Sequence, residues 1–99
     1  MIPKIIHYCW FGKNPMPKHL ISYMATWKQQ MPDWDIHAWD ETSFNIADAP
    51  IYVQQAYEAR KYAFVSDYVR LWALEQFGGV YLDTDVEVVK PFEPLLNDV

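Results

Sequence analysis

The chain has 99 residues, of which 52% are hydrophobic and 21% charged, and its formal net charge is −5. A composition of this kind is typical of one small globular domain and argues against disorder. The acidic balance and the lack of a basic stripe argue against nucleic acid as a partner. An acidic protein can still bind an anionic ligand when a divalent cation supplies the positive charge.

The single cysteine, Cys9, has no second cysteine with which to form an internal disulfide. It lies in an apolar run, so we expect a buried and unreactive side chain, which fits a reducing compartment. The first residues, Met1 to His7, contain no apolar stretch long enough for a signal peptide or a membrane span. From these features we predict a cytoplasmic location.

The first part of the chain predicts a strand, a helix and a second strand. Residues 5–10 form a short apolar and aromatic run, and residues 35–39 form another, which is typical of strands. Between them, a helix is expected to open at Pro17 and to stop at Pro32. Hydrophobic residues at three- and four-residue steps give this helix one buried face: Leu20, Tyr23, Met24, Trp27 and Met31.

The rest of the chain predicts a polar loop, two helices and a third strand. The loop covers residues 40–49, and the helices cover residues 50–60 and 62–77. Gly78 is placed to end the second of these helices. The valine-rich segment 80–89 predicts the third strand.

This order of elements predicts an α/β fold, with a mostly parallel sheet and flanking helices. In open sheets of this kind, ligands bind outside the carboxyl ends of the strands. The turn at residues 10–12 and the loop after Trp39 lie at such ends. We therefore expect a binding site near these two segments.

Two aspartates, Asp83 and Asp85, lie in the otherwise apolar third strand. Aspartate is uncommon in strands and costly to bury. At a spacing of two, both carboxylates would point to one face of an extended strand, where they would repel each other unless a cation lay between them. Mn²⁺ and Mg²⁺ prefer oxygen ligands and are often held by carboxylates together with substrate phosphates. The pair therefore indicates a metal site.

The alternative is a solvent-exposed edge strand with a charged face, which Glu87 would extend. An Asp-x-Asp triplet is short and frequent, so by itself it favours this alternative. The Gly78-Gly79 pair shifts the balance, because it leads the chain sharply from a helix into the strand and keeps Asp83 near the core. Together with the preceding helix, this context favours the metal site.

The helix predicted at residues 62–77 is apolar nearly all round, which is typical of a buried helix. Asp67 and Arg70 are three residues apart on it and able to pair, which would stabilise the helix by only about 0.2–0.5 kcal/mol. That gain is small beside the desolvation of two buried charges. Alternatively, Arg70 offers a planar set of donors to a phosphate or a sugar hydroxyl, and Asp67 accepts from hydroxyls. The helix alone leaves both explanations open.

Three separated segments together resemble one family of proteins. Residues 66–70 (Ser-Asp-x-x-Arg) and 77–85 (Phe-Gly-Gly-Val-Tyr-Leu-Asp-Thr-Asp) closely resemble the core signature of the DxD sugar-transferring glycosyltransferases. Residues 2–12 resemble the first strand of that family, and residues 31–36 its entry to the second strand. The family includes bacterial capsule and lipopolysaccharide transferases, yeast outer-chain mannosyltransferases and, more distantly, clostridial glucosylating toxins. The resemblance spans nearly the whole chain.

The resemblance implies the N-terminal nucleotide-binding part of a GT-A fold, which is Rossmann-like. It also implies a retaining, metal-dependent enzyme that moves a hexose from a nucleotide-diphosphate sugar to a saccharide or lipid-linked acceptor. The process would be the synthesis of cell-surface polysaccharide or lipopolysaccharide. The full-length enzyme would then associate peripherally with a membrane.

By motif position, Trp10 would stack on the nucleotide base, and Tyr81 would lie beside the nucleotide. Asp67 and Arg70 would contact the donor sugar and act as the catalytic residues, with Arg70 also reaching the diphosphate. Asp40, directly after the second strand, is a candidate hydrogen-bonding partner of the nucleotide. No residue is assigned as a catalytic nucleophile.

The resemblance also implies that Asp85 ligates the metal directly, while Asp83 acts through water or the ribose. Trp10 and Tyr81 could instead be packing residues of the core, and that alternative stays open. His7 is expected to be a core histidine with its hydrogen bonds satisfied, because no second His or Cys stands at a metal-ligand spacing.

Complete GT-A catalytic domains are roughly twice as long as this chain or longer. Residues 1–99 would therefore form a single partial domain, the donor-binding half, without the acceptor half. An isolated half would expose sheet edges and apolar surface, so we expect a homodimer.

Two other functions stay open. One is a non-catalytic fragment that binds a nucleotide-sugar. The other is a metal-dependent nucleotidyltransferase or phosphotransferase, which would need further carboxylates or a lysine near the phosphates. The glycine-rich phosphate loop of that chemistry is absent from the sequence.

Overall fold

Three parallel strands form the centre of the fold in the computed structural model, which describes residues 2–91. They are β1 (Ile5–Cys9), β2 (Asp35–Trp39) and β3 (Val80–Tyr81), and their order in the sheet is β2-β1-β3. Ile6 pairs with Ile36 on one side and with Val80 on the other. The predicted α/β fold with a parallel sheet is confirmed.

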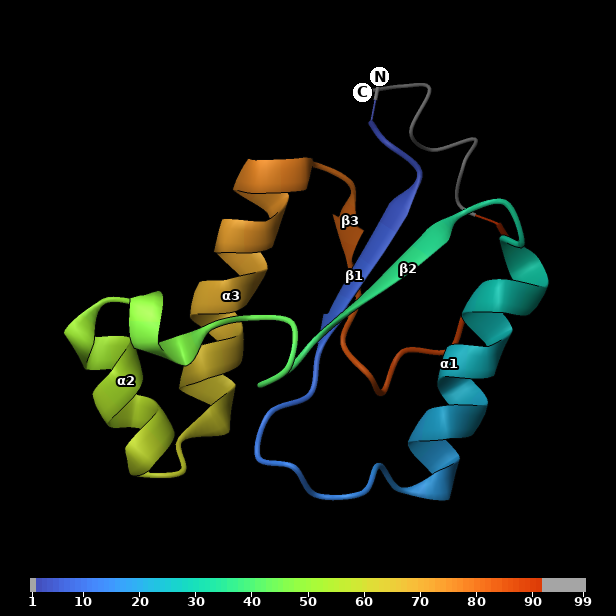
Figure 1. Cartoon of the computed structure of the whole chain (residues 1–99). Coiled ribbons are helices and arrows are strands. Elements are labelled where there is room, and N and C mark those ends of the chain that lie inside the picture. Colours follow the sequence, from blue (N-terminus) through green and yellow to red (C-terminus); the bar gives the residue numbers. More distant parts are fainter. Residues whose placement is uncertain (1, 92–99) are drawn as a thin grey trace.

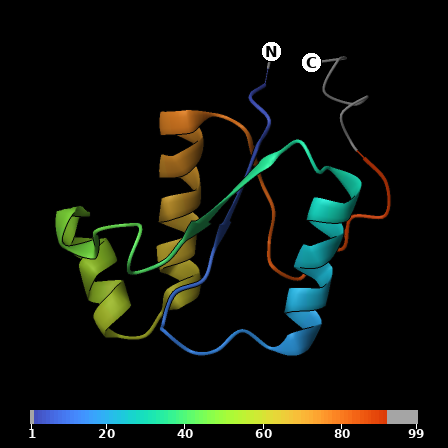
Figure 2. The ribbon, with the colours of Figure 1, turned by 45° about the vertical axis from the view of Figure 1, so that its right-hand side comes forward.

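Helices cover both faces of this sheet (Figure 1). Helix α1 (Lys18–Gln30) lies on one face, and α3 (Tyr62–Phe77) lies on the other. Helix α2 (Ile51–Glu58) packs beside α3, and a short 3₁₀ helix, η1 (Ile46–Asp48), precedes it in the loop after β2. Figure 2 shows the same three layers from a second direction. The predicted helices are therefore present, with ends that differ by one or two residues.

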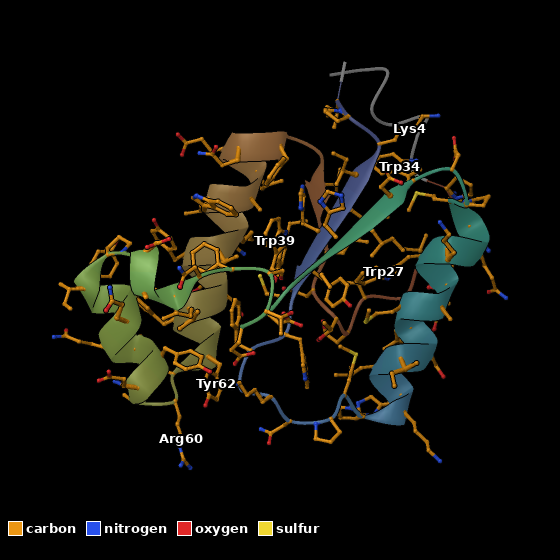
Figure 3. All side chains as sticks on the ribbon, viewed as in Figure 1. Lys4, Trp27, Trp34, Trp39, Arg60 and Tyr62 are labelled. Carbon is orange, nitrogen blue, oxygen red and sulfur yellow. The ribbon has the colours of Figure 1, made fainter. Side chains whose placement is uncertain are left out.

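The alternation of β1 divides the core into two clusters, one on each face of the sheet. Ile6 faces α1 and packs with Trp27, Met31 and Trp34. Cys9 faces the other side and packs in a cluster that includes Trp39 and the buried face of α3. Figure 3 shows Trp27 and Trp34 on the α1 side of the sheet and Trp39 on the α3 side. The predicted burial of Cys9 is confirmed, since its exposed fraction is 6%.

His7 is fully buried between the sheet and the end of α3, and both of its ring nitrogens are hydrogen-bonded. Nε2 lies 2.8 Å from the carbonyl of Gly78, and Nδ1 accepts from the indole N–H of Trp39 at 3.0 Å. A carbonyl only accepts, so Nε2 carries the proton and the ring is neutral. Burial lowers the pKa of His7 and favours this neutral form. The expected core histidine is confirmed.

The Gly78-Gly79 pair brings the chain from α3 directly against β1. Both residues have positive φ angles, +71° and +94°. A Cβ on Gly79 would lie 2.5 Å from the carbonyl oxygen of Ile5, so only glycine allows the two backbones to approach this closely. The amide of Gly78 donates to the carbonyl of Leu74 at 2.9 Å and ends α3, as predicted.

The third strand is much shorter than predicted. It covers Val80–Tyr81 instead of residues 80–89, and one further backbone bond, from Leu82 to His7, extends its pairing with β1. The chain then turns, with the amide of Val86 donating to the carbonyl of Asp83 at 3.1 Å. Aspartate favours turns over strands, and the following valines pack against α1 instead of continuing the sheet.

Helix α3 is not buried all round, so that prediction is wrong. Only Val65, Val69 and Ala73 are fully buried on it. In the described part of the chain, Leu71 is 64% exposed, and Phe64 and Phe77 are exposed as well. Within residues 2–91, no helix is both long and apolar enough to cross a bilayer.

Candidate functional site

An open pocket of about 740 Å³ lies at the carboxyl end of the sheet. It is bounded by the turn after β1, the first turns of α1 and α3, and the turn after β3, which lie together at one end of the molecule in Figure 1. This is the edge at which open parallel sheets bind their ligands. The lining brings together aromatic, polar and acidic side chains from distant segments: Cys9, Trp10, Phe11, Asn14, His19, Leu20, Tyr62, Ser66, Asp67, Tyr81, Asp83, Thr84 and Asp85.

One wall of the pocket is the turn that follows β1, and Trp10 is its large aromatic side chain. The amide of Trp10 donates to the carbonyl of Trp39 at 2.9 Å and so continues the β1–β2 ladder beyond the strand. Its indole N–H donates to the carbonyl of Asn14 at 2.7 Å. The ring is only partly buried, which leaves part of it open to a ligand.

The same turn is fixed at Gly12, whose φ is +105°. Its amide donates to Glu41 Oε2 at 2.5 Å, and this oxygen also accepts from the hydroxyl of Tyr57 at 2.7 Å. Burial disfavours the charged carboxylate, but these hydrogen bonds outweigh it, and the pKa of Glu41 is lowered. The bond to Glu41 in turn raises the pKa of Tyr57 to about 12.

The opposite wall is the turn after β3, which carries Asp83 and Asp85. Both aspartates lie after β3 and not within it, so the prediction that an extended strand points both carboxylates to one face is wrong. Both are exposed, so the predicted cost of burying them does not arise. The two acidic side chains still come together, on one turn at one pocket. The segment after this turn is held to α1, since Trp27 Nε1 donates to the carbonyl of Val86 at 2.8 Å and Thr26 Oγ1 accepts from the amide of Val88 at 2.8 Å.

The oxygen donors on this turn fit a divalent cation that shares its ligands with a substrate. Among residues 2–91, no three His, Cys, Asp or Glu side chains form a group that could hold a metal ion. Mg²⁺ and Mn²⁺ are commonly held by one or two carboxylates together with phosphate oxygens and water, so Asp83 and Asp85 are the side chains that could hold such an ion.

The floor of the pocket is formed by Tyr81 and Cys9. Burial raises the pKa of Tyr81, so its hydroxyl stays protonated. Burial also raises the pKa of the Cys9 thiol to about 11, and the thiol lies 3.9 Å from the carbonyl of Ser66. A thiol with this pKa is a poor nucleophile near neutral pH, in agreement with the inert role predicted for it.

Asp67 lines the pocket from the first half of α3, and Arg70 lies one turn further along the helix. Their closest atoms, Arg70 Nη2 and Asp67 Oδ1, are 3.7 Å apart, and the two side chains are 40% and 69% exposed, respectively. The guanidinium of Arg70 lies 5.7 Å from the centre of the Tyr81 ring. Arg70 itself is not among the lining residues. Both charges are solvated, so the predicted cost of burying them does not arise.

Asp40 is engaged within its own loop and is not part of the pocket lining. Its Oδ1 accepts from the amide of Thr42 at 2.9 Å and from the Thr42 hydroxyl at 2.6 Å. The bonds from Thr42 and Ser43 lower the pKa of Asp40. These contacts make Asp40 a turn-forming residue.

Five of the seven residues selected from the sequence line the pocket, all except Asp40 and Arg70: Trp10, Asp67, Tyr81, Asp83 and Asp85. Arg70 lies just behind them, against Tyr81. Sequence reasoning missed Glu41, Tyr57 and Tyr62. Glu41 and Gly12 are 29 positions apart, so no local pattern indicates their contact. The only available signal was Gly12 itself, a glycine directly after an aromatic strand end.

Comparisons with known proteins identify the family and the fold of this chain. Residues 17–99 match the family model described as a glycosyltransferase sugar-binding region containing a DXD motif. Inositol phosphoceramide mannosyltransferase 3 of Schizosaccharomyces pombe is 33% identical over 97% of the chain. Inositol phosphoceramide mannosyltransferase 1 of the same organism is 29% identical over 97% of the chain. The chain spans 28% and 32% of the length of these two proteins, respectively.

The fold is shared with a solved structure, the PaToxG glycosyltransferase. The TM-score is 0.78 at 23% sequence identity, over 93% of this chain and 45% of that structure. This similarity confirms the α/β fold expected for a GT-A protein. Because the family model covers most of the chain, including the aspartate turn, the chain belongs to the family of glycosyltransferase sugar-binding regions that contain a DXD motif.

Proposed function

We propose that this chain forms the donor-binding part of a hexosyltransferase and binds a nucleotide-diphosphate sugar in the pocket at the end of the sheet. The observation that carries the proposal is the pairing of an aromatic side chain, Trp10, on one wall with the Asp83–Asp85 turn on the other. A nucleotide-sugar has a base that stacks on aromatic rings and a diphosphate that associates with cations. The two walls match these two ends of the ligand.

The cation in this proposal is Mn²⁺ or Mg²⁺, held by Asp85 directly and by Asp83 directly or through water or the ribose. When bound, it would neutralise charge on the leaving diphosphate. The carboxylates of the turn are exposed and belong to one short segment, so they can reach a shared ligand without moving the sheet. Asp83 also lies near Tyr81 and Cys9, whose pKa values it helps to raise.

The catalytic residues in this proposal are Asp67 and Arg70. Asp67 would accept hydrogen bonds from sugar hydroxyls, and its exposed carboxylate lines the pocket. Arg70 would stabilise negative charge on the diphosphate, reaching it past the ring of Tyr81. Tyr81, which keeps its proton, would donate a hydrogen bond beside the nucleotide. We propose retention of anomeric configuration and assign no nucleophile.

The names of the relatives suggest which sugar is transferred and which acceptor receives it. Two of them are named inositol phosphoceramide mannosyltransferases, which suggests mannose as the hexose and a lipid-linked acceptor. Saccharide acceptors in cell-surface polysaccharide or lipopolysaccharide synthesis are the alternative. A cytoplasmic location and peripheral membrane association of a longer enzyme stay predictions from the sequence.

Helix α3 exposes apolar side chains, such as Leu71 and Phe77. Because exposed apolar surface favours association, the homodimer predicted from the sequence is part of the proposal. Sedimentation at increasing protein concentration tests it. A constant monomeric mass would remove the homodimer from the proposal.

Binding without turnover is a second candidate function for these 99 residues. The specific observation is that the chain spans less than a third of the length of either mannosyltransferase relative. A sugar-transfer assay that compares this chain with a version extended to the length of the relatives separates the two functions. Turnover by the chain alone would exclude the binding-only function.

The decisive experiment is calorimetric titration of UDP and GDP into the chain, with and without Mn²⁺. We expect one nucleotide to bind in a manner that requires Mn²⁺, because the diphosphate and the aspartates are both negative. In the variant Asp83→Ala/Asp85→Ala, the Mn²⁺-dependent affinity should fall by at least about a hundredfold, because losing only an outer-shell partner of a metal ligand already costs about 10- to 100-fold.

The matched control is Glu58→Ala/Glu87→Ala, which removes the same charge from exposed positions outside the pocket lining. It should bind like the unchanged chain. Equal loss of affinity in the two double variants would point to a general charge effect and contradict the metal site. The absence of binding to the unchanged chain with either nucleotide would contradict the donor site.

A further inference from the structure

Glu41 connects the Trp10–Gly12 turn to two other elements of the fold. Its Oε2 accepts from the amide of Gly12 at 2.5 Å and from the hydroxyl of Tyr57 at 2.7 Å. Glu41 lies in the loop after β2, and Tyr57 lies on α2. Neither side chain lines the pocket. The turn is therefore held by groups that a bound ligand would not contact.

The position of Glu41 is itself fixed by the loop that carries it. Asp40 Oδ1 accepts from the amide and the hydroxyl of Thr42, at 2.9 and 2.6 Å. The amide of Phe44 donates to the carbonyl of Asp40 at 2.9 Å, and Phe44 is buried in the core. The Glu41 carboxylate thus comes from a hydrogen-bonded turn anchored by a buried side chain.

A steric contact holds the turn from the other side. A Cβ on Gly12 would lie 2.7 Å from Cε2 of Tyr62, so the ring of Tyr62 packs directly against the Gly12 backbone. Tyr62 in turn contacts Tyr57 edge-to-face, with ring centres 5.6 Å apart. Figure 3 shows Tyr62 at the end of α3 that approaches this turn. The Gly12 peptide is therefore confined between a carboxylate and an aromatic ring.

The orientation of the Trp10 ring depends on the path of the chain through Gly12. The backbone of Trp10 is fixed to β2 before Gly12, by its bond to the carbonyl of Trp39. The indole N–H is fixed after Gly12, by its bond to the carbonyl of Asn14. A change in the conformation at Gly12 would move Asn14 relative to Trp10, and the indole would have to turn to keep its bond to Asn14.

We propose that Glu41 and Tyr57 are positioning residues that set the orientation of the Trp10 ring at the pocket in the absence of nucleotide. The consequence for nucleotide affinity rests on the function proposed above, whereas the effect on the Trp10 ring does not. The rival explanation is a peripheral hydrogen bond that only adds to overall stability. The two explanations differ in whether the disturbance is local to Trp10.

The local effect is measured by fluorine NMR of the chain labelled with 5-fluorotryptophan, in which five tryptophans give five resonances. The variant Trp10→Phe assigns the Trp10 resonance. We expect Glu41→Ala to shift and broaden that resonance, while Trp27 and Trp34, in the core cluster on the α1 side, stay unchanged. Glu41→Gln should restore it in part, because the amide oxygen still accepts from Gly12. Tyr57→Phe should shift it less than Glu41→Ala does.

The matched control for these variants is Glu58→Ala, which removes an exposed carboxylate next to Tyr57 and should leave all five resonances in place. An unchanged Trp10 resonance in both Glu41→Ala and Tyr57→Phe would overturn the proposal. Shifts of Trp27 and Trp34 as large as that of Trp10 would overturn it too, since they would indicate a general loss of structure.

Nucleotide affinity gives the second readout, from titration of UDP and GDP in the presence of Mn²⁺. Glu41→Ala should weaken binding by about tenfold, because binding would then have to order the Trp10 side chain and its turn. A shifted Trp10 resonance with unchanged affinity would overturn the link from position to binding. If the unchanged chain binds neither nucleotide, the donor site fails, and the resonances alone decide the role of Glu41.

Discussion

The two turns that form the walls of the pocket are held in different ways. The Trp10–Gly12 turn has a charged side-chain acceptor, an aromatic ring against its backbone and a hydrogen bond within its own segment. The Asp83–Val86 turn has an internal backbone bond, and its hydrogen bonds to α1 come from Val86 and Val88. The two aspartates themselves are exposed to solvent.

This difference suggests that the two walls bind their parts of a ligand in different ways. A rigid aromatic wall binds a flat ring with little loss of conformational entropy, so its order in the free protein favours affinity. Exposed carboxylates that repel each other are better placed by a cation than by the protein, because fixing them without one would be costly. In the proposed function, the aromatic wall would be prepared in advance, and the aspartate wall would be completed by its cation.

The largest effect on stability is expected from Gly12→Ala. The new Cβ would meet the Tyr62 ring at 2.7 Å, and the backbone would keep a φ that L-residues rarely adopt. We expect the free energy of unfolding to fall by about 2 kcal/mol, as measured by urea denaturation. Lys13→Ala is the control, because Lys13 already has a φ of 62° and is exposed. Equal losses in the two variants would mean that the Trp10–Gly12 turn is not rigid.

A smaller loss of stability is expected from Thr26→Val, which affects the segment that follows the Asp83–Val86 turn. This change keeps the shape of the side chain but removes the acceptor of the Val88 amide, a bond of 2.8 Å. The Thr26 hydroxyl also donates to the carbonyl of Tyr23, but that carbonyl lies inside α1 and keeps its helical partner. The free energy of unfolding should therefore fall by about 1 kcal/mol, the usual size of one lost hydrogen bond. Ser22→Ala, at an exposed position of the same helix, serves as the control. A loss as large as that from Gly12→Ala would contradict the difference between the two walls.

The smallest effect on stability is expected from Asp67→Asn. The pair with Arg70 is solvated and 3.7 Å long, so its loss should change the free energy of unfolding by less than about 0.5 kcal/mol. If Asp67 binds the donor sugar, the affinity for a nucleotide-sugar should fall while the affinity for the nucleotide alone stays nearly the same. A stability loss well above about 0.5 kcal/mol, without this selective loss, would make Asp67 a structural residue instead.

The elements could be predicted because their signals are local. Helix α1 has one apolar face at helical spacing, and α3 ends at a glycine, so their positions follow from the sequence alone. The aspartate turn was predicted as a strand because its valines suggest one. In the structure, Val86 and Val88 pack against α1, a tertiary contact that outweighs their strand propensity.

The residues of the site also differ in whether the sequence alone could predict them. Trp10, Asp67, Tyr81, Asp83 and Asp85 belong to short motifs, so a resemblance to a family is enough to group them from the sequence. The contact of Glu41 with Gly12 depends on the loop after β2 folding back to the turn after β1. A link of this kind between distant segments has no signature in a single sequence.

The central position of β1 also has a consequence for how the chain acquires its structure. Ile6 pairs with Ile36 and with Val80, so within residues 2–91 the first strand is flanked by the next strand in the sequence and by the last one. During synthesis, β1 and β2 can pair early, but the second edge of β1 stays open until residues 80–81 leave the ribosome. Pairing over such a separation closes a long loop and is slow. Until then, the exposed edge of β1 can pair with another chain, and the nascent chain is prone to aggregation there.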